Sequence, residues 1–278
     1  MRHPFFIALL LGGSIFLSAC GQPDVSRAVR DAAEAEADSI REIMMTVAEP
    51  RDAIAFFSRQ IEIEPDEIEH YRGLANSLKR GGRNEEAVLA WRKVVAHDDS
   101  GPADMVALAD ALIRTSEWTA AKVVLNTIPP THETFSRYRL EAMVADSEQK
   151  WDRADSFYET AVGLTTRPAG VLNNWGYSKL TRGDNAAAEQ LFVEAITHDS
   201  GLYTAKNNLV LARTARGNYA LPSVPMTQEE RAQLLHTAGV VAIKQGDADL
   251  GRSLLEEAIA THPRHFEAAT RALESLGG

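Results

Sequence analysis

"NNWGYSKLTRGDNAAAEQLFVEAITHDS", residues 173–200, has the apolar and small-residue spacing of two helices joined by a turn. Counting from Ala169 as position 1, the residues that define this spacing stand at positions 7, 8, 15, 20, 24 and 27. They are Trp175, Gly176, Gly183, Ala188, Phe192 and Ala195. Because self-similarity at a fixed period of 20–50 residues indicates a repeat architecture, the same template is tested along the rest of the chain.

The template fits at five further places, and successive units begin 33 or 34 residues apart. Their first residues are Glu34, Ile68, Pro102, Phe135 and Tyr203. The pattern resembles the tetratricopeptide repeat, in which small residues at positions 8 and 20 lie where two helices touch and a bulky residue at position 24 fills the gap. That resemblance implies that Trp91, Trp175 and Phe192 belong to the core.

The C-terminal part departs from the regular pattern. Residues 219–227 contain "LPSVPMT", whose two prolines break a helix where the second helix of the Tyr203 unit is expected, so this segment is predicted to be a loop. Thr227 and Glu230 have the spacing of a capping box at the start of the next helix. The pattern then resumes from Ala232, and residues 264–276 predict an amphipathic helix that caps the last repeat.

These observations predict an all-α fold: a right-handed superhelical solenoid of six to seven tetratricopeptide-like hairpins with a C-terminal capping helix. Sustained alternation of apolar and polar residues, the signal of strands, is nearly absent. The expected organisation has four parts. They are a signal peptide (1–19), a lipidated N-terminus with a lead-in helix (20–33), the solenoid (34–263) and the capping helix with the C-terminus (264–278).

The N-terminus places the single cysteine, Cys20, directly after "LSA", behind a charged start and an apolar block at residues 5–17. The block is too short to span a membrane as a helix, and the arrangement is that of a secretory signal. "LSAC" resembles the lipobox of bacterial lipoproteins, which implies cleavage before Cys20 and its acylation, with palmitate among the acyl chains. Gly21, where inner-membrane lipoproteins of many Gram-negative bacteria carry Asp, then implies the periplasmic leaflet of the outer membrane. The alternative is an ordinary signal peptide with a chance cysteine.

Composition and motifs argue against several classes of function. The formal net charge of −10 and the lack of a long basic run disfavour a nucleic-acid-binding surface. No zinc-protease motif, phosphate-binding loop or Gly-x-Ser-x-Gly element occurs. His262 and His265 have metal-like spacing but flank a proline at a predicted turn. The expectation is therefore a non-enzyme without cofactor, metal or small-molecule substrate.

A repeat solenoid offers a concave surface for binding, lined mainly by the first helix of each hairpin near positions 2, 5, 9 and 12. The candidate groove residues at these positions are Arg72, Asn76, Lys79, Arg139, Asn173, Tyr177 and Asn207. Stacked asparagines carry both donors and acceptors and could hold the backbone of an extended peptide. Asn173 and Asn207 are therefore candidates for groove contact, whereas Asn174 and Asn208 are expected at position 6 for structural reasons. The proline-containing loop is a second candidate binding surface, with a tolerated insertion as its alternative.

The chain combines a lipobox, a repeat solenoid and the C-terminal segment 207–263, and in these features it is similar to TadD-type lipoproteins of the tight-adherence (Flp) pilus system. The proline loop before the last repeat is the most distinctive element of this resemblance. The resemblance implies a non-enzymatic factor for pilus assembly, acting through the outer-membrane secretin. Two alternatives stay open. One is a pilotin-like or scaffold lipoprotein of another envelope machine, for recruiting peptidoglycan hydrolases or assembling outer-membrane proteins. The other is an envelope enzyme with an unrecognised site.

Overall fold

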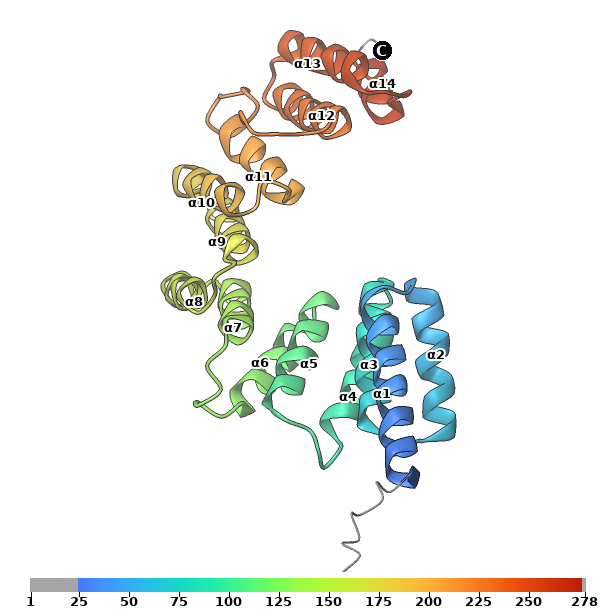
Figure 1. The fold of residues 1–278 in the computed structure, drawn as a ribbon. Helices are drawn as coiled ribbons and strands as arrows, with labels where there is room; N and C mark the ends of the chain where they lie inside the picture. The colour runs from blue at the N-terminus through green and yellow to red at the C-terminus, as the bar shows by residue number, and fades with distance from the viewer. Residues whose placement is uncertain (1–24, 277–278) are drawn as a thin grey trace, which may run out of the picture.

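The computed structural model describes residues 25–276, which form a stack of fourteen α-helices without strands (Figure 1). The helices are α1 (Val25–Thr46), α2 (Pro50–Ile63), α3 (Ile68–Arg80), α4 (Asn84–Val95), α5 (Pro102–Arg114), α6 (Trp118–Thr127), α7 (Phe135–Ser147), α8 (Trp151–Gly163), α9 (Ala169–Thr181), α10 (Asn185–His198), α11 (Tyr203–Thr214), α12 (Gln228–Lys244), α13 (Ala248–Thr261) and α14 (Glu267–Glu274). Within residues 25–276, none of these helices has the length and apolarity needed to cross a membrane.

The repeat register predicted from the sequence is confirmed for the five units from Ile68 onward, whereas the start predicted at Glu34 falls inside α1. The helices α3, α5, α7, α9 and α11 begin at the five predicted unit starts from Ile68 to Tyr203. At the N-terminus, α1 runs without a break across residues 33 and 34. The expected lead-in helix and the first helix of the solenoid are therefore one element.

The turn after each first helix from α3 onward has the same backbone conformation. Every described residue with φ in the left-handed region stands at position 15 of its unit; the six are Gly82, Ser116, Gln149, Gly183, Gly217 and Gly246, with φ between 57° and 92°. Glycine takes this conformation without steric cost, and four of the six turns use it. Ser116 and Gln149 keep the same turn in the two remaining units, so the hairpin geometry is retained without the glycine.

Small residues let the helices approach closely enough to bury one large side chain between them. Phe192 of α10 is fully buried, and a Cβ atom built on Gly176 of α9 would lie 2.7 Å from its Cε1 atom. In the last hairpin two glycines meet, because a Cβ on Gly239 of α12 would lie 3.2 Å from the carbonyl oxygen of Gly251 of α13. These are positions 8, 20 and 24 of the repeat, as predicted.

The predicted core tryptophans have different environments. Trp91 is 4% exposed and packs inside the N-terminal core, as expected. Trp175 is only half-buried, which corrects the expectation for this residue. Its indole N–H donates to Asp155 Oδ1 at 2.6 Å, and its ring stacks on Tyr158. At the edge of the core, the polar Nε1 atom of Trp175 thus has a carboxylate partner.

The hairpin that begins with α11 has no second helix. Residues 215–227 form an irregular connection in its place, and the segment predicted to be a loop, 219–227, lies within it. Pro222 is buried in this loop, and Lys206 of α11, 2% exposed, donates from Nζ to the carbonyl oxygen of Pro225 at 2.9 Å and to Glu230 Oε2 at 3.1 Å. Thr227 and Glu230 make the predicted capping box at the start of α12. A buried ammonium group thus ties the loop to the next hairpin.

At the C-terminal end, α14 covers the last hairpin. Ala269 is fully buried, and Phe266 packs with it against Leu235 and Leu255. This is the position expected of a capping helix, although the helix begins at Glu267, three residues after the predicted segment starts. His262 lies beside Phe266 with its ring stacked on it. The capping helix therefore shields apolar surface that a further repeat would otherwise cover.

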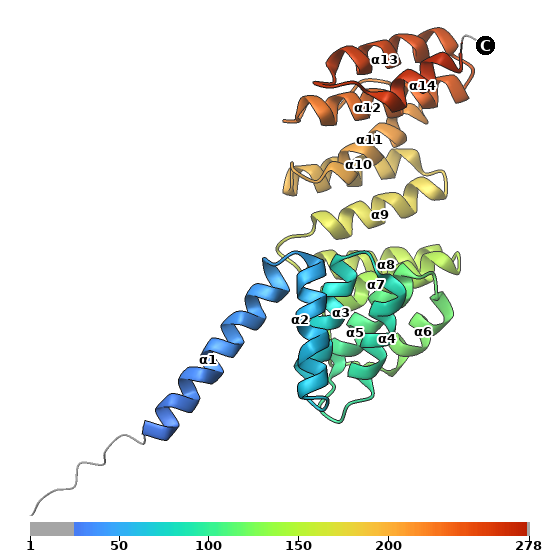
Figure 2. The same ribbon diagram turned by 90° about the vertical axis from the view of Figure 1, so that its right-hand side faces the viewer.

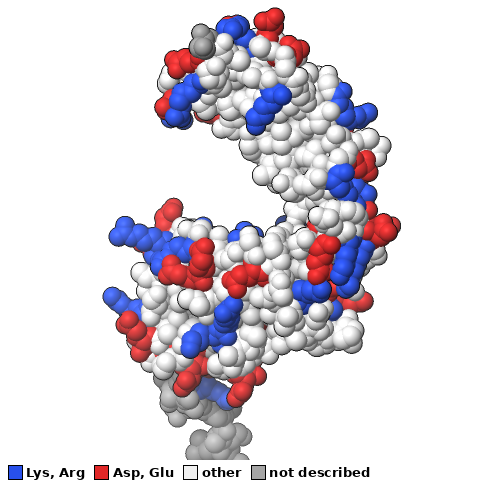
Figure 3. All heavy atoms as spheres, turned by 180° about the vertical axis from the view of Figure 1, so that it is seen from behind, with Lys and Arg blue, Asp and Glu red and all other residues white. Residues whose placement is uncertain are grey.

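The helices together form a C-shaped molecule. Figures 1 and 2 show α1–α6 in one arm and α12–α14 in the other, with α7–α11 between them. Figure 2 shows that α1 projects away from the body of the solenoid. The space-filling view shows the hollow of the C, with an upper wall that carries few charged side chains and a lower wall that carries many (Figure 3).

The packing at Gly176 generates a stability prediction with a control on the same helix. Gly176→Ala should lower the free energy of unfolding by about 1–3 kcal/mol, because the added methyl group collides with Phe192. At Gly170, also on α9, no atom lies within 4 Å of an added Cβ. Gly170→Ala should leave the stability unchanged or raise it by up to about 1 kcal/mol through helix propensity. Chemical denaturation would measure both, and equal effects would contradict this account of the hairpin.

Candidate functional site

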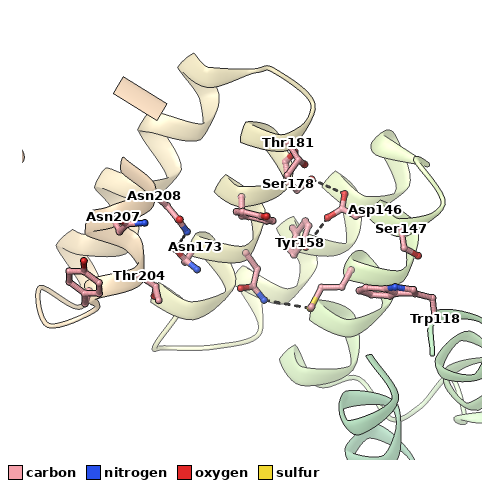
Figure 4. Close-up of a pocket in the computed structure, with 14 residues that line it drawn as sticks. Trp118, Asp146, Ser147, Tyr158, Asn173, Ser178, Thr181, Thr204, Asn207 and Asn208 are labelled. Atoms are coloured by element: carbon pink, nitrogen blue, oxygen red, sulfur yellow. Dashed lines mark hydrogen bonds between the residues drawn. The ribbon is translucent and has the colours of Figure 1, made fainter. Parts of the chain in front are cut away.

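The concave side contains a hollow of about 550 Å³ between α7, α9 and α11. Figure 4 shows its walls. The residues lining it are Trp118, Met143, Asp146, Ser147, Tyr158, Asn173, Asn174, Tyr177, Ser178, Thr181, Tyr203, Thr204, Asn207 and Asn208. We call this the neutral hollow, because Asp146 is the single charged residue among these fourteen. Three of the predicted groove residues, Asn173, Tyr177 and Asn207, therefore lie in one cavity.

Hydrogen bonds within the protein fix the two candidate asparagines. Asn173 Oδ1 accepts from Asn208 Nδ2 at 3.1 Å, and Asn207 Oδ1 accepts from Thr237 Oγ1 at 2.9 Å. Figure 4 shows the first of these contacts between α9 and α11. Since both oxygens are engaged, each side chain retains its amide Nδ2 group, with two N–H donors, for a ligand. Asn208, expected to be structural, is the partner that orients Asn173.

Aromatic rings surround these amides. Tyr177 is 53% exposed and presents its ring to solvent beside Asn173, and Trp118 and Tyr203 stand at other parts of the wall. Aromatic side chains offer a large contact area with few rotatable bonds, which suits a binding surface. Amide donors bordered by aromatic rings can bind an uncharged polar chain whose side chains are partly apolar.

Asp146 contributes the one carboxyl group of the neutral hollow. It accepts hydrogen bonds from Ser178 Oγ at 2.7 Å and from Tyr158 Oη at 2.9 Å. Burial raises the pKa of Asp146 above its ordinary value of 3.8 and outweighs these two hydrogen bonds, which act in the opposite direction. The phenol of Tyr158 is itself buried, and its pKa is well above 10.0 through burial and the nearby Asp146.

A second cavity, of about 520 Å³, lies farther towards the N-terminus between α3, α5 and the start of α7. Its lining includes Lys79, Asp110, Glu133 and Arg139, so we call it the charged hollow. Two predicted groove residues, Lys79 and Arg139, are therefore brought together here. The pKa of Asp110 is held below its ordinary value: burial would raise it, but Arg114, Arg139 and Lys79 lower it.

The remaining two predicted groove residues line neither of these hollows. Arg72 of α3 donates to both carboxylate oxygens of Asp104 in α5, from Nε at 2.9 Å and from an Nη atom at 2.6 Å. Asn76 donates to the carbonyl oxygen of Arg72 at 3.0 Å, one turn earlier in the same helix. Both side chains thus have partners within the protein, and their contact with a ligand stays a prediction.

Several residues of the neutral hollow were not identified from the sequence. Asp146 stands at position 12 of its unit and Thr204 at position 2. Both are inward positions, so the repeat register was the signal that could have identified these residues. Trp118 and Tyr158 come from second helices, which the rule for inward positions leaves out.

Cys20, the predicted lipidation site, lies outside the described residues. Within residues 25–276, no three or more His, Cys, Asp or Glu side chains are grouped so that they could hold a metal ion.

Comparisons with known proteins identify the fold. No family model matches the sequence, and no curated protein matches it. A tetratricopeptide repeat protein from Parabacteroides merdae has a similar structure, with a TM-score of 0.58 and 12% identity over 91% of this chain and 100% of that one. A chain of the Cut9–Hcn1 hetero-tetramer of APC/C gives a TM-score of 0.60 and 13% identity over 85% of this chain, but this chain spans only 48% of its length.

A third similar structure is human IFIT1, determined as a dimer with PPP-AAAA. It gives a TM-score of 0.58 and 16% identity over 82% of this chain and 59% of that one. At such low identities the likeness concerns the fold alone. The described residues of this chain accordingly have the fold of tetratricopeptide-repeat proteins.

The raised pKa of Asp146 predicts a pH dependence of stability. Because the folded protein holds this proton more tightly than the unfolded chain, the contribution of Asp146 is present at low pH and is lost as the pH rises through the folded pKa. The free energy of unfolding of Asp146→Asn, relative to that of the wild type, should therefore increase as the pH is raised from about 4 to about 7. Denaturation at several pH values would measure this, with exposed Asp152→Asn as the matched control. Parallel curves for wild type and Asp146→Asn would contradict it.

Proposed function

We propose that this chain is a non-enzymatic scaffold that binds an extended segment of a partner protein in the neutral hollow. The observation that carries the proposal is the pair of asparagines, Asn173 and Asn207, whose amide oxygens are engaged within the protein. Their Nδ2 groups are thereby oriented before any ligand arrives. Preorganised donors lower the entropy cost of binding. The tetratricopeptide-repeat fold also supports a protein-binding scaffold.

The spacing of the two asparagines suits a regular extended backbone. Both stand at position 5, on consecutive first helices, and packed helices lie about 8–10 Å apart. A chain in the polyproline II conformation rises about 3.1 Å per residue and presents the same face every three residues, or about every 9 Å. Two carbonyl oxygens on one face of such a segment would therefore meet the two amide groups. Tyr177, which is one turn after Asn173 on α9 and 53% exposed, would contact the side chains.

We further propose that the scaffold is anchored through Cys20 in the periplasmic leaflet of the outer membrane and takes part in assembly of a tight-adherence (Flp) pilus through its secretin. The support is the "LSAC" sequence and the likeness of residues 207–263 to TadD-type lipoproteins. An alternative is a pilotin-like or scaffold lipoprotein of another envelope machine, which recruits peptidoglycan hydrolases or assists assembly of outer-membrane proteins. The pilus function and this alternative would use the same neutral hollow and would differ only in the partner protein.

The partner can be identified by cross-linking. The full-length affinity-tagged lipoprotein would be cross-linked in envelopes of its native host, and the co-purifying proteins would be identified by mass spectrometry. Recovery of a secretin or of other pilus components would support the pilus assignment. Recovery of cell-wall hydrolases or barrel-assembly proteins would keep the scaffold and reject the pilus.

The hollow itself is tested by removing the amides. Asn173→Ala combined with Asn207→Ala should weaken partner binding about tenfold or more, because each lost hydrogen bond contributes about 0.5–1.5 kcal/mol. Stability should change by no more than about 1–2 kcal/mol. The matched control, Asn126→Ala with Asn185→Ala, removes two amides from α6 and α10 and should leave binding intact. Equal losses of folding and binding in the first variant would make these asparagines structural.

The anchor is tested separately. Cys20→Ser should leave the chain folded but release it from the outer membrane or block its processing, because the acyl chains are lost. Two buried acyl chains suffice for stable anchoring. Fractionation of envelopes and mass measurement of the mature protein would show the change, and pilus formation would report function. Full function from a soluble pool would refute the requirement for anchoring.

A further inference from the structure

The charged hollow has more positive groups around its buried carboxylate than that carboxylate can neutralise. Asp110, whose side chain is 14% exposed, accepts from Arg114 Nε at 2.9 Å and from an Nη atom of Arg139 at 3.2 Å. Lys79 Nζ lies 3.9 Å from the same carboxylate. Among the described residues, none of these three cations has a second carboxylate within 4.0 Å. Three positive charges therefore share one negative charge.

These charges lie along one diagonal of the concave surface. Lys79, Asp110 and Arg139 stand at positions 12, 9 and 5 of three consecutive first helices, α3, α5 and α7. The side chains of Lys79 and Arg139 are 34% and 24% exposed, so an incoming group can reach both. Figure 3 shows that charged side chains are gathered on the lower, N-terminal wall of the hollow of the C.

The one other carboxylate in the cavity wall, Glu133, carries a negative charge but is not paired with these cations. It accepts a hydrogen bond from Tyr138 Oη at 3.2 Å, and it makes no ion pair with a described cation within 4.0 Å. Two apolar side chains of the same wall are unusually open: Phe135 is 40% exposed and Leu164 is 43% exposed. The cavity thus combines cations that share a single paired carboxylate with apolar contact area.

We propose that the charged hollow binds an acidic residue of the partner segment, a Glu or Asp next to a bulky apolar residue, with its carboxylate between Lys79 and Arg139. This inference rests on the proposed function and assigns a sequence preference and a direction to the same groove. The acidic residue lies towards the N-terminal arm, and the uncharged part of the segment lies in the neutral hollow. Charge complementarity is what commits the site to this occupant.

The test uses the full-length protein in detergent and three capped peptides, Gly-Ser-Leu-Glu-Leu-Glu-Leu-Gly-Ser and its counterparts with Gln or Lys in place of Glu. The Glu peptide should bind about five- to tenfold more tightly than the Gln peptide, as expected for a few partly exposed ion pairs. The Lys peptide should bind most weakly. Raising the salt concentration should narrow the differences, because salt screens exposed charges. Equal binding of the Glu and Gln peptides would overturn the proposal.

Substitutions in the charged hollow should change the affinity for the Glu peptide in opposite directions. Lys79→Gln with Arg139→Gln should reduce binding of the Glu peptide to the level of the Gln peptide. The control with the same change in charge, Arg92→Gln with Lys93→Gln on α4, should not. Asp110→Asn should strengthen binding of the Glu peptide, since it removes the carboxylate that competes for the same cations. Weaker or unchanged binding in a folded Asp110→Asn protein, checked by circular dichroism, would overturn the proposal.

Two further outcomes separate this inference from the proposed function. If the Gln peptide binds as tightly as the Glu peptide, and the Asn173→Ala, Asn207→Ala variant no longer binds it, the proposed function is supported and the acidic preference is refuted. If sedimentation shows a dimer that the Glu peptide dissociates, the occupant is the exposed acidic part of α1 in a second copy, around Glu34, Glu36 and Asp38, and the partner assignment is wrong. Failure of all peptides, with no cross-linked partner in envelopes, would count against the proposed function itself.

Discussion

Close contact between helices at small residues sets the geometry of the hairpins. At Gly176 there is no room for one more carbon beside Phe192, and at Gly239 and Gly251 two backbones nearly touch. Large-to-small complementarity of this kind leaves few alternative packings, because protein interiors are filled to the density of organic crystals. The turn between the helices then has to be tight, and the left-handed residue at position 15 supplies it. Each hairpin repeats the same geometry, so the stack curves.

Curvature places the first helix of most hairpins on the inside, and the polar residues of those helices give the concave surface its chemistry. The neutral hollow derives its properties from amides whose orientation is fixed within the protein. The charged hollow derives them from cations gathered on Asp110. Two adjacent cavities on one fold can therefore contact different parts of one extended chain. The fold supplies the surface, whereas the side chains at a few inward positions determine what it recognises.

The fold was predictable because the repeat pattern depends on local residue size. Small residues at positions 8 and 20 and a large one at 24 can be recognised in the four units from Ile68 to Ala169, and the spacing of 33 or 34 residues then predicts the helix starts. The site was predictable only in part. Asn173 and Tyr177 were found from their positions, and Asp146 and Asp110 stand at equally inward positions. Their roles, however, depend on partners in neighbouring units, such as Tyr158 or Arg139, which the register does not reveal. Likewise, no sequence pattern indicates that the ammonium group of Lys206 is buried against the loop.

The missing second helix after α11 has a consequence for the groove. The C-terminal arm is joined to the rest of the solenoid by an irregular segment held by Pro222 and Lys206. One contact across this joint, from Thr237 in the arm to the amide oxygen of Asn207, belongs to the candidate binding site. The orientation of the C-terminal arm and the orientation of that amide therefore depend on each other. Lengthening or shortening the connection at residues 215–227 would reorient the C-terminal arm without altering any helix. It would also change the orientation of the Asn207 amide, one of the two donors in the neutral hollow.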